Sequence, residues 1–186
     1  MNLVVAVTGA TGAHAAELLI DRSPWPVTLI GSDWGKDVCR RECGSFDELA
    51  RRASTVLDDG DLSAPIASGS VPTAGMVILP CSTDTLGKVA GGIADSLITR
   101  AAHCHLKERR TLVLCVRESP WTLIDLDNAR RVAAAGGIIM PLSPPYYMVA
   151  GKTPDAVSMT DLLGAFVDRV LAVLGHPAGS DWETVS

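Results

Sequence analysis

The sequence has no apolar run long enough to cross a membrane. A spanning helix needs roughly 20 consecutive apolar residues, whereas each apolar run in this 186-residue chain covers only a few positions. The start, MNLVVAVTGATG, has no basic segment ahead of its first apolar run and therefore predicts no signal peptide. We expect a cytoplasmic protein without a membrane partner.

Paired cysteines and a surplus of positive charge are also missing. The five cysteines, Cys39, Cys43, Cys81, Cys104 and Cys115, are odd in number and show no paired spacing. We interpret them as reduced thiols, which fits a cytoplasmic protein. The formal net charge of −5 disfavours nucleic acid as the main partner, because nucleic-acid phosphates attract basic surfaces.

What the sequence does contain is an alternation of short apolar runs with helical patterns. Its length fits one domain, and 47% apolar residues are ample for a core. The alternation predicts an α/β fold of three layers, a Rossmann-like or flavodoxin-like parallel sheet with helices on both faces. We expect one domain over residues 1–175 and a tail over 176–186. The expected strands are 3–7, 26–30, 76–79, 112–116 and 138–141, and the expected helices include 13–21, 34–42, 46–53, 127–135 and 162–174.

The segment 76–118 organises this pattern as strand, turn, two helices and strand. Its first strand ends in the hydroxyl-rich turn Pro80-Cys81-Ser82-Thr83, and its second strand leads into Arg117-Glu118. Open parallel sheets bind ligands at the carboxyl ends of their strands. We therefore expect one ligand-binding edge, formed by Gly9 to Gly12, Ser32, Pro80 to Thr85, Arg117-Glu118 and the loop at Tyr147.

Two of these loops suit a phosphate. The glycines of Thr8-Gly9-Ala10-Thr11-Gly12 let the backbone approach a ligand, and the helix that follows offers N–H groups and a positive dipole end. The spacing is not G-x-G-x-x-G, so a mononucleotide fits better than a dinucleotide. An ordinary strand-to-helix turn is the alternative. Ser32 likewise either bonds a phosphate or ribityl hydroxyl, or caps the next helix.

Six motifs together resemble one known family. They are Gly9-Ala10-Thr11-Gly12, Pro80-Cys81-Ser82-Thr83-x-Thr85-Leu86, Ala94-Asp95-x-Leu97-Ile98-x-Arg100-Ala101-Ala102, Leu106-Lys107-Glu108-Arg109-Arg110, Val116-Arg117-Glu118-x-Pro120 and the Pro-x-x-Tyr147 loop. The sequence resembles the flavin prenyltransferases of the UbiX type, from Leu3 to about Gly175. The block from 80 to 120 is the longest and most specific part of the likeness.

The resemblance implies an activity and its ligands. Members of the family join a dimethylallyl group, taken from dimethylallyl monophosphate, to N5 and C6 of reduced FMN. The prenylated FMN then serves a separate reversible decarboxylase of aromatic acids. The family needs no metal, and its usual assembly is a homododecamer with sites at subunit interfaces. The sequence leaves open whether the monophosphate or the diphosphate is the preferred donor.

The resemblance also assigns roles to residues of this chain. Glu118 is expected to protonate the departing phosphate, and Glu42 and Thr11 are expected to handle a proton near N5. The FMN-binding residues it implies are Gly9, Ala10, Thr11, Ser32, Ser82, Thr83, Asp84, Thr85 and Arg117. The prenyl phosphate is expected at Tyr147, Arg169, Lys107 and Arg100, partly supplied by a neighbouring chain.

The chain departs from the family pattern at three places. Thr11 stands where the family usually has Ser, so that a methyl group crowds the flavin edge. Ala15-Ala16 replaces a usual Tyr-Gly, which predicts a change in helix packing or in an interface. Leu62 stands where an aromatic residue is common, which bears on the wall of the prenyl pocket.

Alternative interpretations remain for several residues and for the whole protein. Arg100 and Lys107 also fit a solvated helix face, and Cys81 fits a small packing residue better than a nucleophile. His103 and His105 point to different faces of one helix, which disfavours a metal site. The competing functions are an FMN-dependent cysteine decarboxylase of the related flavoprotein class and a non-catalytic flavin-binding subunit of a decarboxylase.

Overall fold

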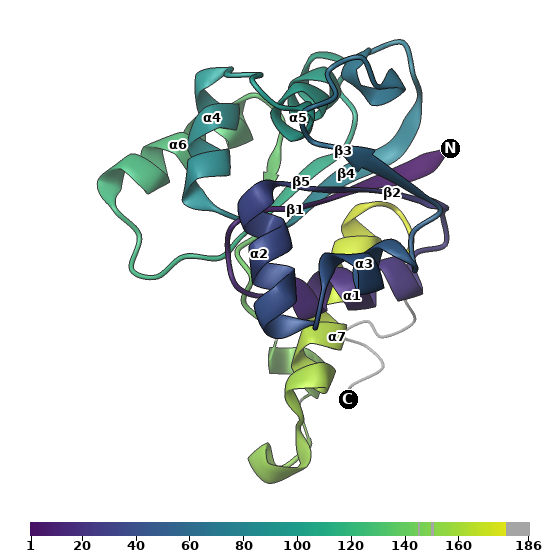
Figure 1. Cartoon of the computed structure of the whole chain (residues 1–186). Coiled ribbons are helices and arrows are strands. Elements are labelled where there is room, and N and C mark those ends of the chain that lie inside the picture. Colours follow the sequence, from purple (N-terminus) through teal and green to yellow (C-terminus); the bar gives the residue numbers. More distant parts are fainter. Residues whose placement is uncertain (145, 150, 178–186) are drawn as a thin grey trace.

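The fold is built on a parallel β-sheet (Figure 1). The computed structural model describes residues 1–144, 146–149 and 151–177. Within these residues the sheet has six strands in the order β3-β2-β1-β4-β5-β6, all paired in parallel. This is the strand order of Rossmann folds, and it confirms the predicted fold class. The strands are β1 (Asn2–Val7), β2 (Val27–Gly31), β3 (Thr55–Asp58), β4 (Thr73–Cys81), β5 (Leu112–Val116) and β6 (Ile138–Ile139).

Helices cover both faces of the sheet. On one face lie α1 (Ala13–Arg22), α2 (Asp33–Glu42), α3 (Phe46–Ala50) and α7 (Met159–Val173). On the other face lie α4 (Thr83–Gly91), α5 (Leu97–Lys107), α6 (Leu123–Ala134) and the short 3₁₀ turn η1 (Pro65–Ala67). The 3₁₀ turns η2 (Tyr146–Val149) and η3 (Pro154–Ala156) precede α7, in a segment that extends away from the sheet in Figure 1.

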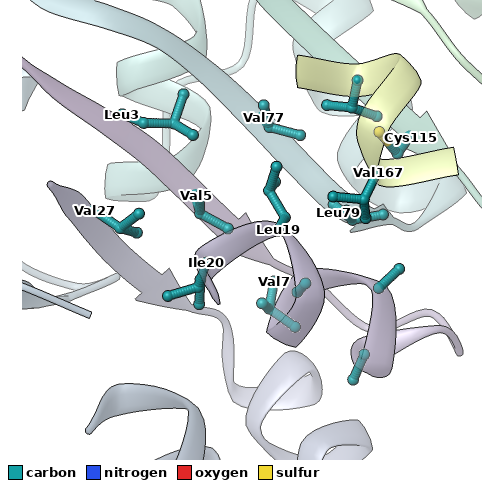
Figure 2. Close-up of a cluster of buried hydrophobic side chains, with 14 of the residues drawn as sticks. Leu3, Val5, Val7, Leu19, Ile20, Val27, Val77, Leu79, Cys115 and Val167 are labelled. Atoms are coloured by element: carbon teal, nitrogen blue, oxygen red, sulfur yellow. The ribbon is translucent and has the colours of Figure 1, made fainter. Parts of the chain in front are cut away.

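Alternating side chains of the central strands supply the two cores. Leu3, Val5 and Val7 of β1 face α1 and α7, whereas Val4 and Ala6 face the α4–α5 layer, and all five are completely buried. Figure 2 shows the first of these cores, with α1 and α7 packed on β1 and β4. Strands buried on both faces read as continuous apolar runs, which is why the sequence predicted them.

Hydroxyl caps explain where most of the helices begin. Ser32, Ser45, Ser82, Ser96, Thr122 and Ser158 are the N-cap residues of α2, α3, α4, α5, α6 and α7, and each side chain accepts a hydrogen bond from a backbone N–H three residues later. Such caps satisfy donors that a helix start leaves without an intrahelical partner. Helix α1 differs, because its N-cap is Gly12, in a left-handed conformation with φ of 113°.

The structure differs from the sequence prediction at the edges of the fold. Strand β3 was not predicted, and α6 begins at Leu123 rather than at residue 127. Both segments carry exposed apolar side chains, so no buried stripe marks them in the sequence. Most of the predicted tail lies outside the described residues, although the ring of His176 meets Trp25 edge-on at 5.9 Å. Among the residues described, no helix has the length and apolarity needed to cross a bilayer.

Helix α2 packs so closely on the end of β1 that only glycine fits at one position. A Cβ atom on Gly35 would lie 2.2 Å from the carbonyl oxygen of Val7. We expect Gly35→Ala to push α2 away from the sheet, lowering the apparent free energy of unfolding by about 1–3 kcal/mol and weakening FMN binding. Denaturant unfolding at a fixed protein concentration and FMN titration measure the two effects.

Gly87→Ala is the matched control within a helix. A Cβ atom on Gly87 would meet its nearest neighbour, Asn128, at 3.5 Å, an ordinary contact. Alanine also favours helix over glycine by about 0.5–1 kcal/mol, so this variant should be as stable as the parent or slightly more stable. Equal effects of the two substitutions would contradict the close packing of α2.

Candidate functional site

Thr8 joins the carboxyl ends of the two central strands. Its hydroxyl donates to the carbonyl oxygen of Pro80 at 3.0 Å and accepts from the backbone N–H of Ser82 at 2.9 Å. The side chain is almost fully buried. These bonds fix the loop after β1 against the loop after β4, at the point where the strand order reverses. Ligands of open α/β sheets bind at this point.

A cleft of about 740 Å³ opens over these strand ends. Among the described residues, eighteen line the cleft. Eight of them are serine or threonine, so the cleft is rich in hydroxyl groups, and Trp34 is the aromatic residue among them. Such a lining suits the ribityl chain and phosphate of FMN, and the volume lies in the usual range for cofactor sites. The lining residues are Thr8, Gly9, Ala10, Thr11, Ser32, Asp33, Trp34, Asp59, Ser82, Thr83, Asp84, Thr85, Lys88, Ser96, Ile98, Thr99, Arg117 and Glu118.

Three helix N-termini converge on the cleft. Ser32, Ser82 and Ser96, the N-caps of α2, α4 and α5, all line it. Each N-terminus carries the positive end of a helix dipole, which favours an anion. Lys88 contributes less to this field, because it already pairs with Asp84 at 3.7 Å and Asp95 at 3.2 Å. The site therefore attracts a phosphate mainly through dipoles and hydrogen-bond donors.

Helix α1 does not have the free N-terminus that the glycine turn predicted. The carboxylate of Glu42 accepts from the backbone N–H groups of Gly12 at 2.9 Å and Ala13 at 2.7 Å. The expectation that these helix-start groups meet a phosphate is thus wrong, because an acidic side chain from α2 already occupies them. Glu42 lies next to the predicted flavin loop, and its part in proton handling stays a prediction.

Arg117 lies beside the flavin loop. Its Nε donates to Oγ1 of Thr11 at 2.6 Å, which links the end of β5 to the loop after β1. Glu118 lines the same cleft, and its Oε1 accepts from the backbone N–H of Ser119 at 3.0 Å. The predicted FMN-binding residues and Glu118 therefore meet in one cleft, as the strand-end argument expected. Their chemical roles stay predictions.

The four residues predicted to hold the prenyl phosphate lie in two places. Tyr147 belongs to η2, which contacts α7, and Arg169 is exposed on α7. Arg100 and Lys107 belong to α5, on the opposite face of the sheet, and line a separate groove of about 690 Å³ with Leu62. None of the four lines the flavin cleft of their own chain.

Contacts within the α5 groove hold its two basic side chains. Arg100 donates from Nε to the carbonyl oxygen of Ala67 at 2.9 Å, and Lys107 pairs with Glu108. These contacts place Arg100 on a partly buried wall rather than on a freely solvated helix face. Leu62, one of the departures from the family pattern, is about half exposed on the same groove.

Four other residues that the sequence analysis named are buried in the structure. Ala15 and Ala16 belong to α1 and are fully buried in the first core, so this departure bears on helix packing within the chain. Cys81 is buried, and burial raises the pKa of its thiol far above the usual value, as expected of a packing residue. His105 is buried between Thr73 and the carbonyl oxygen of Ala101, both 2.7 Å away, and burial lowers its pKa.

Sequence reasoning missed several lining residues of the cleft. Asp59 follows the strand that was not predicted, and its Oδ1 accepts from the N–H of Ile98 at 2.8 Å. Ser96 and Thr99 form a capping box, whose spacing was a readable signal for the start of α5. Trp34 is 75% exposed at the cleft and carries no such signal.

Comparisons with known proteins agree with this site. The family described as Flavoprotein matches residues 1–170. A protein of Deinococcus radiodurans named flavin prenyltransferase UbiX is 44% identical over 178 residues, covering 94% of this chain and 88% of that protein. Fold, cleft and family match thus define a flavoprotein.

Two solved structures indicate which kind of flavoprotein this chain resembles. The crystal structure of AnUbiX (PadA1) in complex with FMN and dimethylallyl pyrophosphate has a TM-score of 0.88 at 36% identity, covering 96% of this chain and 94% of that one. A dodecameric FMN-dependent UbiX-like decarboxylase from Escherichia coli O157:H7 has a TM-score of 0.85 at 35% identity, covering 96% of each chain. The chain belongs to the flavin prenyltransferase family.

Substitution tests the two hydrogen bonds that the carboxylate of Glu42 accepts at the start of α1. Glu42→Ala leaves the N–H groups of Gly12 and Ala13 without their acceptor, which costs about 1–3 kcal/mol for buried groups. We expect a lower apparent free energy of unfolding and weaker FMN binding, since the flavin loop directly precedes these residues. Glu42→Gln retains an acceptor oxygen and should keep most of the stability. A Gln variant as unstable as the Ala variant would contradict a stabilising role for these two hydrogen bonds.

Proposed function

We propose that this protein transfers a dimethylallyl group from dimethylallyl monophosphate to N5 and C6 of reduced FMN. The main support is the meeting of Gly9 to Thr11, Ser82 to Thr85 and Arg117 in one hydroxyl-rich cleft of cofactor size. Relatives at 35–44% identity over nearly the whole chain are named flavin prenyltransferases, which favours this activity over cysteine decarboxylation.

The residues around the cleft suit the chemistry of prenyl transfer. The three helix N-termini favour the phosphate of FMN. Arg117, fixed by its bond to Thr11, is placed to offset negative charge on the reduced ring. The allylic C–O bond of the donor would break as its carbon bonds N5, with the phosphate as leaving group and with loss of the N5 proton. The alkene of the prenyl group would then bond C6, and the proton lost from C6 would pass to the prenyl chain, so that the flavin gains C5H8. Glu118 then supplies a proton to the leaving phosphate.

The donor phosphate site is proposed to lie between two chains. A phosphate dianion needs several cationic partners once water is excluded. The predicted partners lie on opposite faces of the sheet, Tyr147 and Arg169 beside α7 and Arg100 and Lys107 on α5. A neighbouring copy that brings its α5 groove to the α7 side of this chain would complete the site.

The proposal extends to the assembly, the partner protein, the domain and the location. A homo-oligomer, by analogy a dodecamer, fits the assembly of the E. coli O157:H7 relative. The prenylated FMN would serve a partner decarboxylase of aromatic acids. Residues 1–175 would form the single FMN-binding domain, and the five free cysteines fit a cytoplasmic location.

The activity is tested by anaerobic incubation with reduced FMN and dimethylallyl monophosphate. We expect a prenylated flavin with a shifted absorption spectrum and the mass of one added C5 unit. Glu118→Gln should bind FMN normally but turn over about 10²–10⁴-fold more slowly, the usual contribution of a general acid. A parallel reaction with dimethylallyl diphosphate compares the donors. Unchanged FMN with both donors would refute the activity, and a Gln variant of full activity would remove Glu118 from its role.

A mixing experiment tests the shared phosphate site. Arg100→Ala and Arg169→Ala should each abolish most of the turnover. If the two arginines of one site come from different chains, co-expression of the two variants should restore about a quarter of the parent activity, because random mixing leaves that share of interfaces intact. Mixed oligomers as inactive as the single variants would place both arginines in the same chain's site. Mixing parent with parent under the same protocol is the control.

A further inference from the structure

A cluster of three different metal-ligating side chains lies outside the flavin cleft. His14 and Glu17 are on the first two turns of α1, and Cys43 directly follows α2 as its C-cap. Their ligand atoms, Nδ1, a carboxylate oxygen and Sγ, all lie within 4.8 Å of one another. None of the three lines the cleft. The prenyl transfer proposed above assigns them no role.

The spacing of these atoms matches a tetrahedral metal centre. Nδ1 of His14 lies 3.3 Å from Oε2 of Glu17 and 3.5 Å from Sγ of Cys43. Bonds of about 2.0–2.3 Å from zinc to nitrogen, oxygen and sulfur put neighbouring tetrahedral ligands about 3.3–3.8 Å apart. The third pair, Oε2 of Glu17 and Sγ of Cys43, lies within 4.8 Å, so that a small movement of these side chains would bring all three atoms to bonding distance of one ion.

The surroundings orient the ligands and leave them accessible. The second oxygen of Glu17, Oε1, is held by Arg52 at 2.6 Å, which turns Oε2 towards His14. Partners of this kind, one bond removed from the ion, fix ligand orientation at metal sites. The side chain of His14 is 54% exposed, so an ion can enter from solvent.

We propose that His14, Glu17 and Cys43 form a binding site for a divalent transition-metal ion of the zinc type. The mixed nitrogen, oxygen and sulfur donors suit Zn²⁺ or Co²⁺ rather than Mg²⁺ or Ca²⁺, which prefer oxygen alone. The bound ion joins the first turns of α1 to the end of α2. This is the junction at which Glu42 also holds Gly12 and Ala13, so the ion stiffens the support of the flavin loop without touching the reacting atoms.

Cobalt substitution reads out the sulfur ligand directly. The full-length protein, purified with chelator and kept reduced, is titrated with Co²⁺ alone. We expect one ion per chain and a near-ultraviolet charge-transfer band from thiolate to cobalt, displaced by Zn²⁺. Cys43→Ser should abolish the band, while Cys104→Ser, at a buried thiol of α5, should retain it. No band in the parent protein, or an equal band in Cys43→Ser, would overturn the proposal.

Two further variants test the remaining ligands and guard against misfolding. His14→Ala and Glu17→Gln should each weaken Co²⁺ binding at least 10-fold, whereas His103→Ala, at an exposed histidine of α5, should not change it. Zn²⁺ should raise the Tm of the parent by about 2–4 °C or more, the shift expected for about 1 kcal/mol in a chain of this size, and should leave the Tm of Glu17→Gln unchanged. A Zn²⁺-induced rise in Tm that is the same in Glu17→Gln and the parent would show that the ion binds elsewhere.

Discussion

The hydroxyl of Thr8 is the contact on which the rest of the site depends. It joins the loop after β1 to the end of β4, more than 70 residues further along the chain, by bonding both Pro80 and Ser82. Similar backbone bonds tie Ser32 to Val7 and Arg117 to Cys81, so that the ends of β1, β2, β4 and β5 form one connected edge. The flavin-binding loops have little freedom of their own, because each begins at a strand end that its neighbour holds.

Charge and dipoles contribute to the cleft in different ways. The protein is acidic overall, and four acidic side chains line the cleft, namely Asp33 and Asp84 in the first turns of α2 and α4, Asp59 after β3 and Glu118 after β5. A phosphate-bearing ligand is still favoured, because three helices direct their positive ends at the same space. This field belongs to the backbone, so it persists when the pH or the protonation of single side chains changes. Arg117 adds a side-chain cation that bonds the flavin loop.

The sequence predicted the strands whose side chains are completely buried. Val4, Val77 and Leu114 belong to strands with both faces covered, and their apolar runs were visible. Strand β3 was not predicted because Thr55, Val56 and Asp58 are exposed at the edge of the sheet. An exposed strand shows no continuous run of apolar residues in the sequence. Asp59 was missed with it. The strand-end rule located Ser32, Ser82 and Arg117, whereas the bond of Glu42 to α1 depends on how two helices pack, which no local motif encodes.

The sequence could not assign the phosphate-binding residues to one place either. Arg100 and Arg169 were carried over from a family likeness, and the likeness says nothing of which chain supplies which side chain. Their separation by the thickness of the sheet became visible only with the layers in place. The cluster of His14, Glu17 and Cys43 is a similar case, because its members come from two helices and adopt ligand spacing only after packing.

Helix α7 closes the first core by packing on α1 and on the face of the sheet that α1 also covers. Its buried residues, Phe166, Val167 and Val170, stand more than 140 positions after α1 begins. During synthesis the apolar face formed by Leu3, Val77 and Val113 therefore lacks the cover of α7 until almost all of the described chain has left the ribosome. Such surfaces promote aggregation of nascent chains, so the emerging polypeptide is an expected client of chaperones that shield apolar surface until translation nears its end.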